Sequence, residues 1–246
     1  AHDLVARYRA SKGYDANNVL SFVAYCGGVP KIPNPFRYKF SWAPLGERSL
    51  KNFEEFKVAR PWDAITSYDA PLPQPESFEV YPNRDSYPFM EDYRFDPAWR
   101  VKDFVRGTIR LNGWEAAWTP VFREIETLSG PTGDARLAEM ADQFVRENSY
   151  APGEPDRVIL FVSLKAERDG KIMFHETWSM DAWGDAKGTA MARLVSTPVS
   201  FAVESLLAGD IAAGVHPAPH DPKLYTIWLG QVRGLVQYME RLDHIA

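Results

Sequence analysis

The stretch VLSFVAYCGGVP, residues 19–30, decides the fold that we expect. Its strongly apolar part, Val19 to Cys26, predicts a buried strand, which would form a rigid base for a site. Gly27 and Gly28 follow directly, and because they lack a Cβ, their N–H groups can approach a ligand closely. The loop after them is dense in proline, aromatic and cationic residues. We therefore expect a polar substrate to be held where this strand ends.

The rest of the chain predicts strands and helices that do not alternate strictly. Asp169-Gly170, between two alternating runs, is its strongest hairpin signal. Thr197-Pro198 is typical of the cap and first residue of a helix. We expect strands over 19–26, 78–81, 101–111, 158–168 and 171–183, and helices over 3–12, 114–128, from 134 onward, 198–209 and 221–242. This combination predicts an α+β fold, with a mixed, mostly antiparallel sheet and helices packed over one face.

We divide the chain into a substrate-binding and dimerisation domain, residues 1–220, and a C-terminal amphipathic helix, residues 221–246. The second part carries an apolar stripe at helical spacing, which has to be buried. It could pack on its own domain, on a homodimer partner or on a domain outside this chain. The stripe consists of Leu224, Trp228, Val232, Leu235, Met239 and Leu242.

Composition excludes several classes of protein. With 246 residues, 45% of them hydrophobic, the chain can bury a full core. Its net charge of −5 and its interspersed charges argue against a nucleic-acid partner or an anionic membrane surface. No apolar run approaches the length that crosses a bilayer. The single cysteine suits a reducing compartment, so we expect a cytoplasmic protein without disulfides.

Four motifs occur in one order: YCGGVP at 25–30, YPNRDS at 81–86, RGTIR at 106–110 and GTAMAR at 188–193. Together they resemble the saccharopine dehydrogenase (saccharopine reductase) family. The resemblance implies an NAD(P)-dependent oxidoreductase of lysine or other amino-acid metabolism. Such an enzyme interconverts an imine and a secondary amine at a C–N bond of an amino-acid-derived substrate.

The nucleotide-binding part of that family precedes these motifs. A dinucleotide site needs G-x-G-x-x-G between a strand and a helix, and this spacing occurs nowhere in the chain. We therefore expect the C-terminal part of a longer enzyme, whose N-terminal Rossmann domain binds NAD(P). The isolated chain should bind no cofactor tightly and be inactive. Its expected partners are that domain, an amino-acid substrate and a second copy in a homodimer.

Arg84 is the first candidate for substrate binding. A guanidinium grips a carboxylate through two parallel hydrogen bonds, and Arg84 follows a strand in a polar turn. The resemblance implies that the matching arginine holds a substrate carboxylate. A structural pairing of Arg84 with Asp85 is the alternative.

Backbone groups supply the other candidates. Gly27 and Gly28 could donate N–H groups to the substrate, although a simple tight turn would also explain them. Gly107, inside an alternating strand, indicates a bulge or a close backbone approach. The resemblance places further substrate contacts in the same stretch, at Thr108, Ile109 and Arg110. Lys39 and Ser41 we interpret as structural.

We assign no general acid or base, although Asp85, Cys26 and Tyr38 are conceivable contributors. No metal site is predicted, because Pro217 and Pro219 interrupt the helical spacing of His216 and His220. The short segment after Arg110 resembles lysine 6-dehydrogenase and carboxynorspermidine synthase more than saccharopine reductase, so the substrate stays open. The alternative function is a non-catalytic module that binds a small carboxylate ligand or serves as a scaffold.

Overall fold

The computed structural model describes residues 1–36, 48–58, 60–83 and 85–245. The strands of these residues form one nine-stranded sheet in the order β3-β2-β6-β1-β7-β8-β9, with β5 also paired to β6 and β4 to β5. Only β1 and β6 run parallel; the other described pairs are antiparallel. The strands are β1 Val19–Pro30, β2 Ser49–Lys51, β3 Glu54–Phe56, β4 Thr66–Ala70, β5 Glu76–Pro82, β6 Arg100–Leu111, β7 Asp156–Arg168, β8 Lys171–Trp183 and β9 Tyr238–Asp243. The predicted mixed, mostly antiparallel sheet is confirmed.

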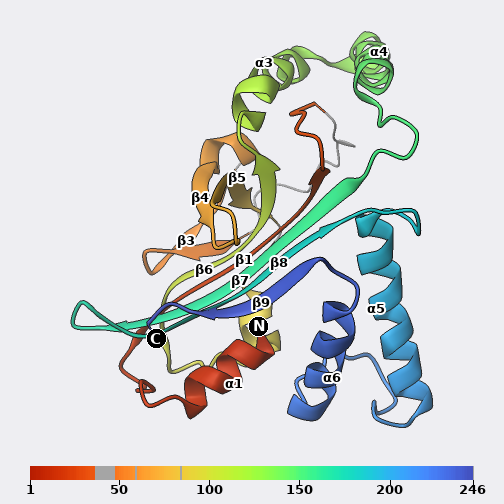
Figure 1. Cartoon of the computed structure of the whole chain (residues 1–246). Helices are drawn as coiled ribbons and strands as arrows, with labels where there is room; N and C mark the ends of the chain where they lie inside the picture. The colour runs from red at the N-terminus through yellow and green to blue at the C-terminus, as the bar shows by residue number, and fades with distance from the viewer. Residues whose placement is uncertain (37–47, 59, 84, 246) are drawn as a thin grey trace.

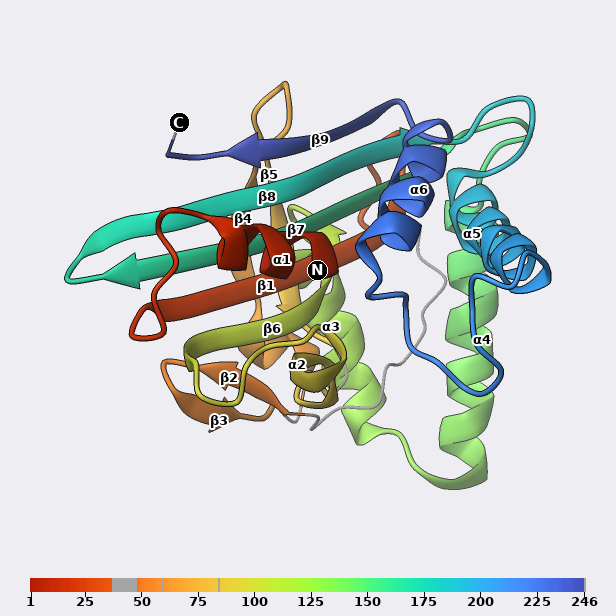
Figure 2. The same cartoon turned by 90° about the horizontal axis from the view of Figure 1, so that it is seen from below.

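Helices α1, α5 and α6 lie on one side of this sheet, and the β4–β5 hairpin lies on the other (Figures 1 and 2). We call these sides the helical face, which carries Phe22 and Phe104, and the hairpin face, which carries Tyr25 and Ile109. The predicted α+β fold with helices over one face is thereby confirmed. The helices are α1 His2–Ala10, α2 Pro88–Asp92, α3 Trp114–Thr127, α4 Gly130–Asn148, α5 Ala190–Leu207 and α6 Pro222–Arg233, with a 3₁₀ turn, η1, at Pro61–Ala64.

The helical face holds two separate apolar clusters. At one end, α1 and α2 pack on β1 and β6, where the rings of Phe22 and Phe104 stack with their centroids 4.8 Å apart. At the other end, α5 and α6 pack on β7, β8 and β9 around Ala190 and Met180. Because the two clusters cover opposite ends, the sheet between them is left to line a cavity.

The hairpin face is closed by β4 and β5. Tyr68 of β4 packs against Tyr25 and Phe161, with ring centroids 5.1 and 5.4 Å apart. Phe78 and Ile109, both fully buried, complete this cluster. It supports the strands from behind, so the segments that line the helical face cannot easily shift.

The turn between β7 and β8 shows how closely local sequence can determine structure. Asp169 and Gly170 have φ angles of 50° and 75°. Both lie in the left-handed region that the tight two-residue hairpin turn requires, which explains Asp-Gly at this place. The predicted hairpin strands agree with β7 and β8 to within two residues.

The start of α5 differs from the prediction. The helix begins at Ala190, and Pro198 lies inside it instead of at its first position. The Thr189 hydroxyl accepts from the N–H of Ala192, while the Asp156 carboxylate accepts from those of Ala190 and Met191. These caps satisfy the N–H groups of the first turn and outweigh the loss of one hydrogen bond at the proline.

The C-terminal helix is shorter than predicted. It ends at Arg233, and residues 238–243 form β9, which pairs with β8. The expectation of a helix to about Leu242 is wrong, because main-chain pairing at the sheet edge competes with helix formation. Leu224 and Met239 of the stripe are buried on the chain's own core. The division at residue 220 stays a prediction.

No helix among the described residues is long and apolar enough to cross a membrane.

Candidate functional site

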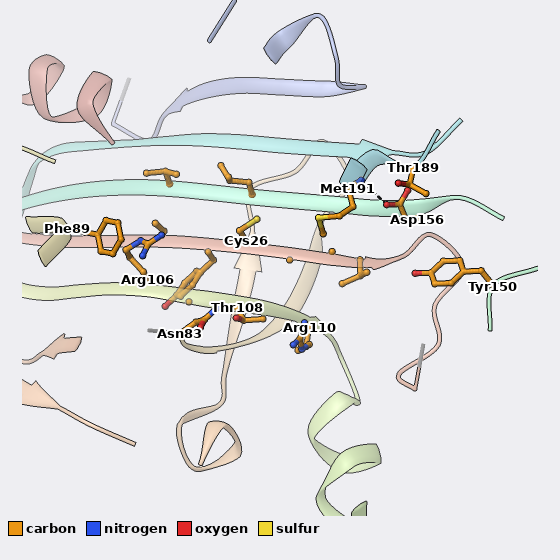
Figure 3. Close-up of a pocket in the computed structure, with 18 of the residues that line it drawn as sticks. Cys26, Asn83, Phe89, Arg106, Thr108, Arg110, Tyr150, Asp156, Thr189 and Met191 are labelled. Atoms are coloured by element: carbon orange, nitrogen blue, oxygen red, sulfur yellow. Dashed lines mark hydrogen bonds between the residues drawn. The ribbon is translucent and has the colours of Figure 1, made fainter. Parts of the chain in front are cut away.

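A groove of about 990 Å³ lies on the helical face, between the two apolar clusters. Its floor is the second half of β1, with β6 on one side and β7 on the other. Phe89 and Tyr93 bound it near α2, while Tyr150 and the first turn of α5 bound it at the far end (Figure 3). The expectation of a site along the end of this strand therefore coincides with a cavity.

The residues predicted on β6 divide between the two faces. Thr108 and Arg110 line the groove together with Arg106, because alternate side chains of a strand share a face (Figure 3). Ile109 points the other way and is fully buried with Val29 and Phe78. Only the backbone of Ile109 could therefore serve a ligand.

Three glycines line the groove, and the space around each one would admit a Cβ to a different degree. A Cβ on Gly27 would lie 2.6 Å from the carbonyl oxygen of Ile109, and one on Gly107 would lie 2.7 Å from the Tyr25 ring. These two positions are glycine because the hairpin face behind them is filled. Gly28 faces the groove, where a Cβ would meet only the Met191 side chain. All three line the groove with their backbone.

Arg106 dominates the α2 end of the groove. Its guanidinium carbon lies 3.6 Å from the centroid of the Phe89 ring. Among the residues that the structure describes, no Asp or Glu forms an ion pair with this half-buried side chain. The Tyr93 hydroxyl accepts a hydrogen bond from Arg106, and the remaining N–H groups of the stacked guanidinium stay available for a carboxylate.

Polar groups that suit a substrate lie next to Arg106. Thr108 brings a hydroxyl to the floor, and the buried Oδ1 of Asn83 has no hydrogen-bond partner among the described residues. Burial raises the pKa of Tyr93, although the Arg106 cation opposes this rise. A buried acceptor without a partner costs free energy unless a ligand satisfies it.

Cys26 lies in the middle of the floor, with its side chain exposed to the groove (Figure 3). The protein packed around the floor raises the pKa of this thiol, and the nearby Arg106 cation only partly compensates. The thiol therefore stays protonated at neutral pH and can act as a weak donor, not as a nucleophilic thiolate.

The far end of the groove is built around α5. Asp156 lines it, but both carboxylate oxygens accept N–H groups of the first turn of α5, at 2.7 and 2.9 Å. This carboxylate is a helix cap, stabilised by the helix dipole. Met191 projects from the same turn towards the floor (Figure 3).

Of the remaining candidates, Arg84, Lys39, Ser41 and Tyr38 fall outside the described residues. Asp85 pairs with Arg48 at 2.8 Å. Burial alone would raise the pKa of Asp85, but Arg48 and the N–H of Tyr87 lower it below its ordinary value. The Asp85 carboxylate is therefore ionised, and it already accepts hydrogen bonds from Arg48 and Tyr87.

No group of three or more potential metal ligands occurs in the part of the chain that the structure describes. His216 contacts the carbonyl oxygen of Ala212, and His220 lies beside Arg94.

The sequence analysis missed Arg106, Asn83 and Met191. A signal for Arg106 was present, because its period of two with Thr108 and Arg110 places all three on one face. Met191 lay in a quoted motif, but misplacing the start of α5 concealed its role.

Comparisons with known proteins agree on one family. The model of the saccharopine dehydrogenase C-terminal domain matches residues 2–235. The mitochondrial alpha-aminoadipic semialdehyde synthase of Bos taurus is 24% identical over 284 residues, which include 84% of this chain and 30% of that protein. Saccharopine dehydrogenase [NADP(+), L-glutamate-forming] of Pyricularia oryzae is 36% identical over 107 residues, which include 39% of this chain and 23% of that enzyme.

A solved structure shares the fold. Apo saccharopine dehydrogenase (L-Glu forming) from Saccharomyces cerevisiae superposes with a TM-score of 0.71 and 20% identity. The match covers 98% of this chain and 71% of the yeast chain. This chain thus spans less than a third of the Bos taurus synthase and less than three quarters of the yeast enzyme.

Proposed function

Because this chain belongs to the saccharopine dehydrogenase C-terminal domain family, we propose that it is the substrate-binding and dimerisation domain of an NAD(P)-dependent oxidoreductase. The complete enzyme acts on amino-acid-derived substrates and interconverts an imine and a secondary amine. The observation that carries the proposal is Arg106, a stacked and half-buried cation without a described acidic partner, at one end of a groove.

Arg106 would bind a carboxylate of the substrate. A half-buried guanidinium without a counter-ion among the described residues has lost part of its hydration, so a carboxylate ligand would replace the lost interactions with water. Thr108 and Asn83 would orient the rest of the substrate through the hydroxyl and the unpaired Oδ1. Holding the reacting C–N bond in one position is this domain's share of catalysis.

The other predicted contacts complete the proposal. Gly27, Gly28 and Gly107 border the groove with their backbone, and Arg110 would be a second cation for a substrate with more than one carboxylate. Arg84 keeps its proposed role from sequence, since it directly follows Asn83. No residue is assigned as general acid or base.

The double glycine of β1 does not open a helix that could hold a dinucleotide. Gly27 and Gly28 lie inside β1, which continues to Pro30, so no helix begins there to hold a pyrophosphate. We therefore assign NAD(P) to a separate Rossmann domain of the full-length enzyme.

The outer side of α5 suits the docking of that domain. Val195, Val199, Val203 and Leu206 recur at steps of four, four and three and are all exposed. Because α5 begins at the groove with Met191, a domain seated on these residues would lie beside the substrate. Homodimerisation would use another surface, for which the open edge of β9 is available. A cytoplasmic location stays a prediction from the sequence.

The alternative is a non-catalytic module that binds a small carboxylate ligand, because the same Arg106 would serve it. The coding sequence upstream of Ala1 discriminates between the two functions. A G-x-G-x-x-G motif after a first strand there supports the enzyme, and an open reading frame that starts at this chain supports the module.

Calorimetric titration of this chain with saccharopine tests the site. We expect saturable binding, and much weaker binding of cadaverine, which has amino groups but no carboxylate. Equal binding of the two compounds, or no binding of saccharopine, would contradict a carboxylate site. A micromolar dissociation constant for NADPH with this chain would contradict the assignment of the cofactor to another domain.

A further inference from the structure

Met191 reaches across the groove from the first turn of α5. A Cβ added to Gly28 on the floor would lie 2.1 Å from the Cε methyl of Met191. The methyl group therefore already rests on the backbone of β1. Only glycine at position 28 leaves room for this contact.

The sheet register locates Met191 along the groove. On β1, Ala24 pairs with Arg106 and Cys26 with Thr108. Gly28 pairs with Val158 of β7, and Pro30 pairs with Asp156. Met191, at the level of Gly28, thus separates the Arg106 end from the end where Asp156 caps α5. Figure 3 shows the same sequence of side chains along the strand.

The backbone of Met191 is fixed, whereas its side chain is free to move. The N–H of Met191 donates to Asp156 at 2.9 Å, and the preceding Ala190 is fully buried in the core. The side chain itself is 43% exposed. A methionine has three flexible torsions and fills irregular space. The thioether end of Met191 can therefore change rotamer at small cost while its backbone stays in place.

We propose that Met191 sets the length of substrate that the groove accepts. This inference rests on the proposed function, because it assumes that a carboxylate binds Arg106. From Ala24 to Gly28 the strand rises by about 13 Å. The site would therefore take an α-amino acid with a long unbranched chain, extended from Arg106 and ending against the Met191 thioether.

A homologous series of ligands tests the length limit on this 246-residue chain. The probes are the unbranched α-amino acids from norleucine to 2-aminotetradecanoate, which carry one carboxylate and whose apolar chains bracket this span, with affinity measured by calorimetry. For the wild type, we expect affinity to rise by up to about fourfold per added methylene and then to fall once the chain meets Met191. In Met191→Ala the fall should come one or two methylenes later. Ile172→Ala, an exposed truncation at the distant β7–β8 turn, should keep the wild-type profile.

A second variant checks the contact itself. Gly28→Ala should displace the Met191 side chain and shorten the accepted ligand, and adding Met191→Ala should restore the longer limit. An effect of Gly28→Ala that is equal in both backgrounds overturns the proposal. A length profile that Met191→Ala leaves unchanged also overturns it, while Arg106 and the proposed function stand. If no member of the series binds the wild type, both are overturned.

Discussion

Two half-buried arginines lie on the two strands that flank β1, and their surroundings differ completely. Arg157 of β7, on the hairpin face, donates four hydrogen bonds to Glu76 and Asp181, at 2.6 to 2.9 Å. Burial alone would lower the pKa of Arg157, but these two carboxylates raise it above its ordinary value. Arg106 of β6, on the helical face, stacks on Phe89 and has no described acidic partner.

The difference separates a structural cation from a binding cation. Arg157 ties β5, β7 and β8 together, and its hydrogen-bonding capacity is used inside the fold. Arg106 donates to the Tyr93 hydroxyl and keeps its remaining N–H groups for a ligand in the groove. Residue type and strand position do not distinguish the two arginines, so the role of each one follows only from the side chains that it contacts. Four experiments test whether the two faces of the sheet differ in this way.

The largest effect is expected for Arg157→Ala. Removing one partner of a buried ion pair leaves uncompensated charge, here on Glu76 and Asp181, and should lower the free energy of unfolding by about 3–5 kcal/mol. Urea denaturation measures it. Arg136→Ala, which breaks an exposed network with Glu124 and Glu139, is the matched control and should lower the free energy of unfolding much less, because solvent screens these exposed charges. Equal losses in both variants would contradict a structural role for Arg157.

Arg106→Ala should act on binding instead. We expect saccharopine affinity to fall by about 2–4 kcal/mol, roughly thirty- to a thousand-fold, with little change in stability. Arg106→Lys should recover little of this loss, because the planar fork is missing. Calorimetry measures both variants, with exposed Arg100→Ala on the same strand as the control. Unchanged affinity together with a large loss of stability would show that Arg106 has a structural role like that of Arg157.

The pH dependence of stability probes another satisfied polar group of the hairpin face. Burial, then His244 and Lys165, lowers the pKa of His175 to about 4. Thr177 donates to Ser163, whose hydroxyl is thereby left to donate to Nε2 of a neutral His175.

Because the folded pKa of His175 is lower than the unfolded value of about 6.5, the unfolded chain takes up the proton first. The stabilisation is complete above pH 6.5 and is lost as the pH falls towards 4. After allowance for solvent screening, we expect a loss of about 1–2 kcal/mol in denaturation experiments over this range. His175→Asn should flatten the dependence. If the stability of this variant fell with pH as steeply as that of the wild type, the pH dependence would come from other groups.

The smallest effect concerns Ile109, which the sequence placed among the substrate contacts. Its side chain is fully buried on the hairpin face, so Ile109→Val should lower stability by about 0.5–1.5 kcal/mol and leave saccharopine binding unchanged. Thermal unfolding and calorimetry on the same samples test this. Weakened binding at unchanged stability would place the side chain in the site.

Much of the site could be predicted from motifs, but the roles of its residues could not. The sequence indicated Gly27, Gly28, Thr108 and Arg110, which all line the groove. It could not show that the Cβ position of Gly27 is filled by the backbone of Ile109, since the two residues are 82 positions apart. The alternation of Arg106 with Thr108 and Arg110 shows which face it shares, but it does not show which partners lie on that face, so its role was missed.

From the sequence alone, β1, β5, β6, β7, β8, the β7–β8 turn and the family could be predicted. Alternation, turn propensity and short motifs act between near neighbours, so they can be read directly. The tertiary structure decided where α5 starts, because its cap comes from Asp156, 34 residues before Ala190. It also turned residues 238–243 into an edge strand, since β8 offered main-chain partners that a helix could not use. Which arginine serves the fold and which faces a ligand depends on such distant partners, and only the assembled sheet brings them together.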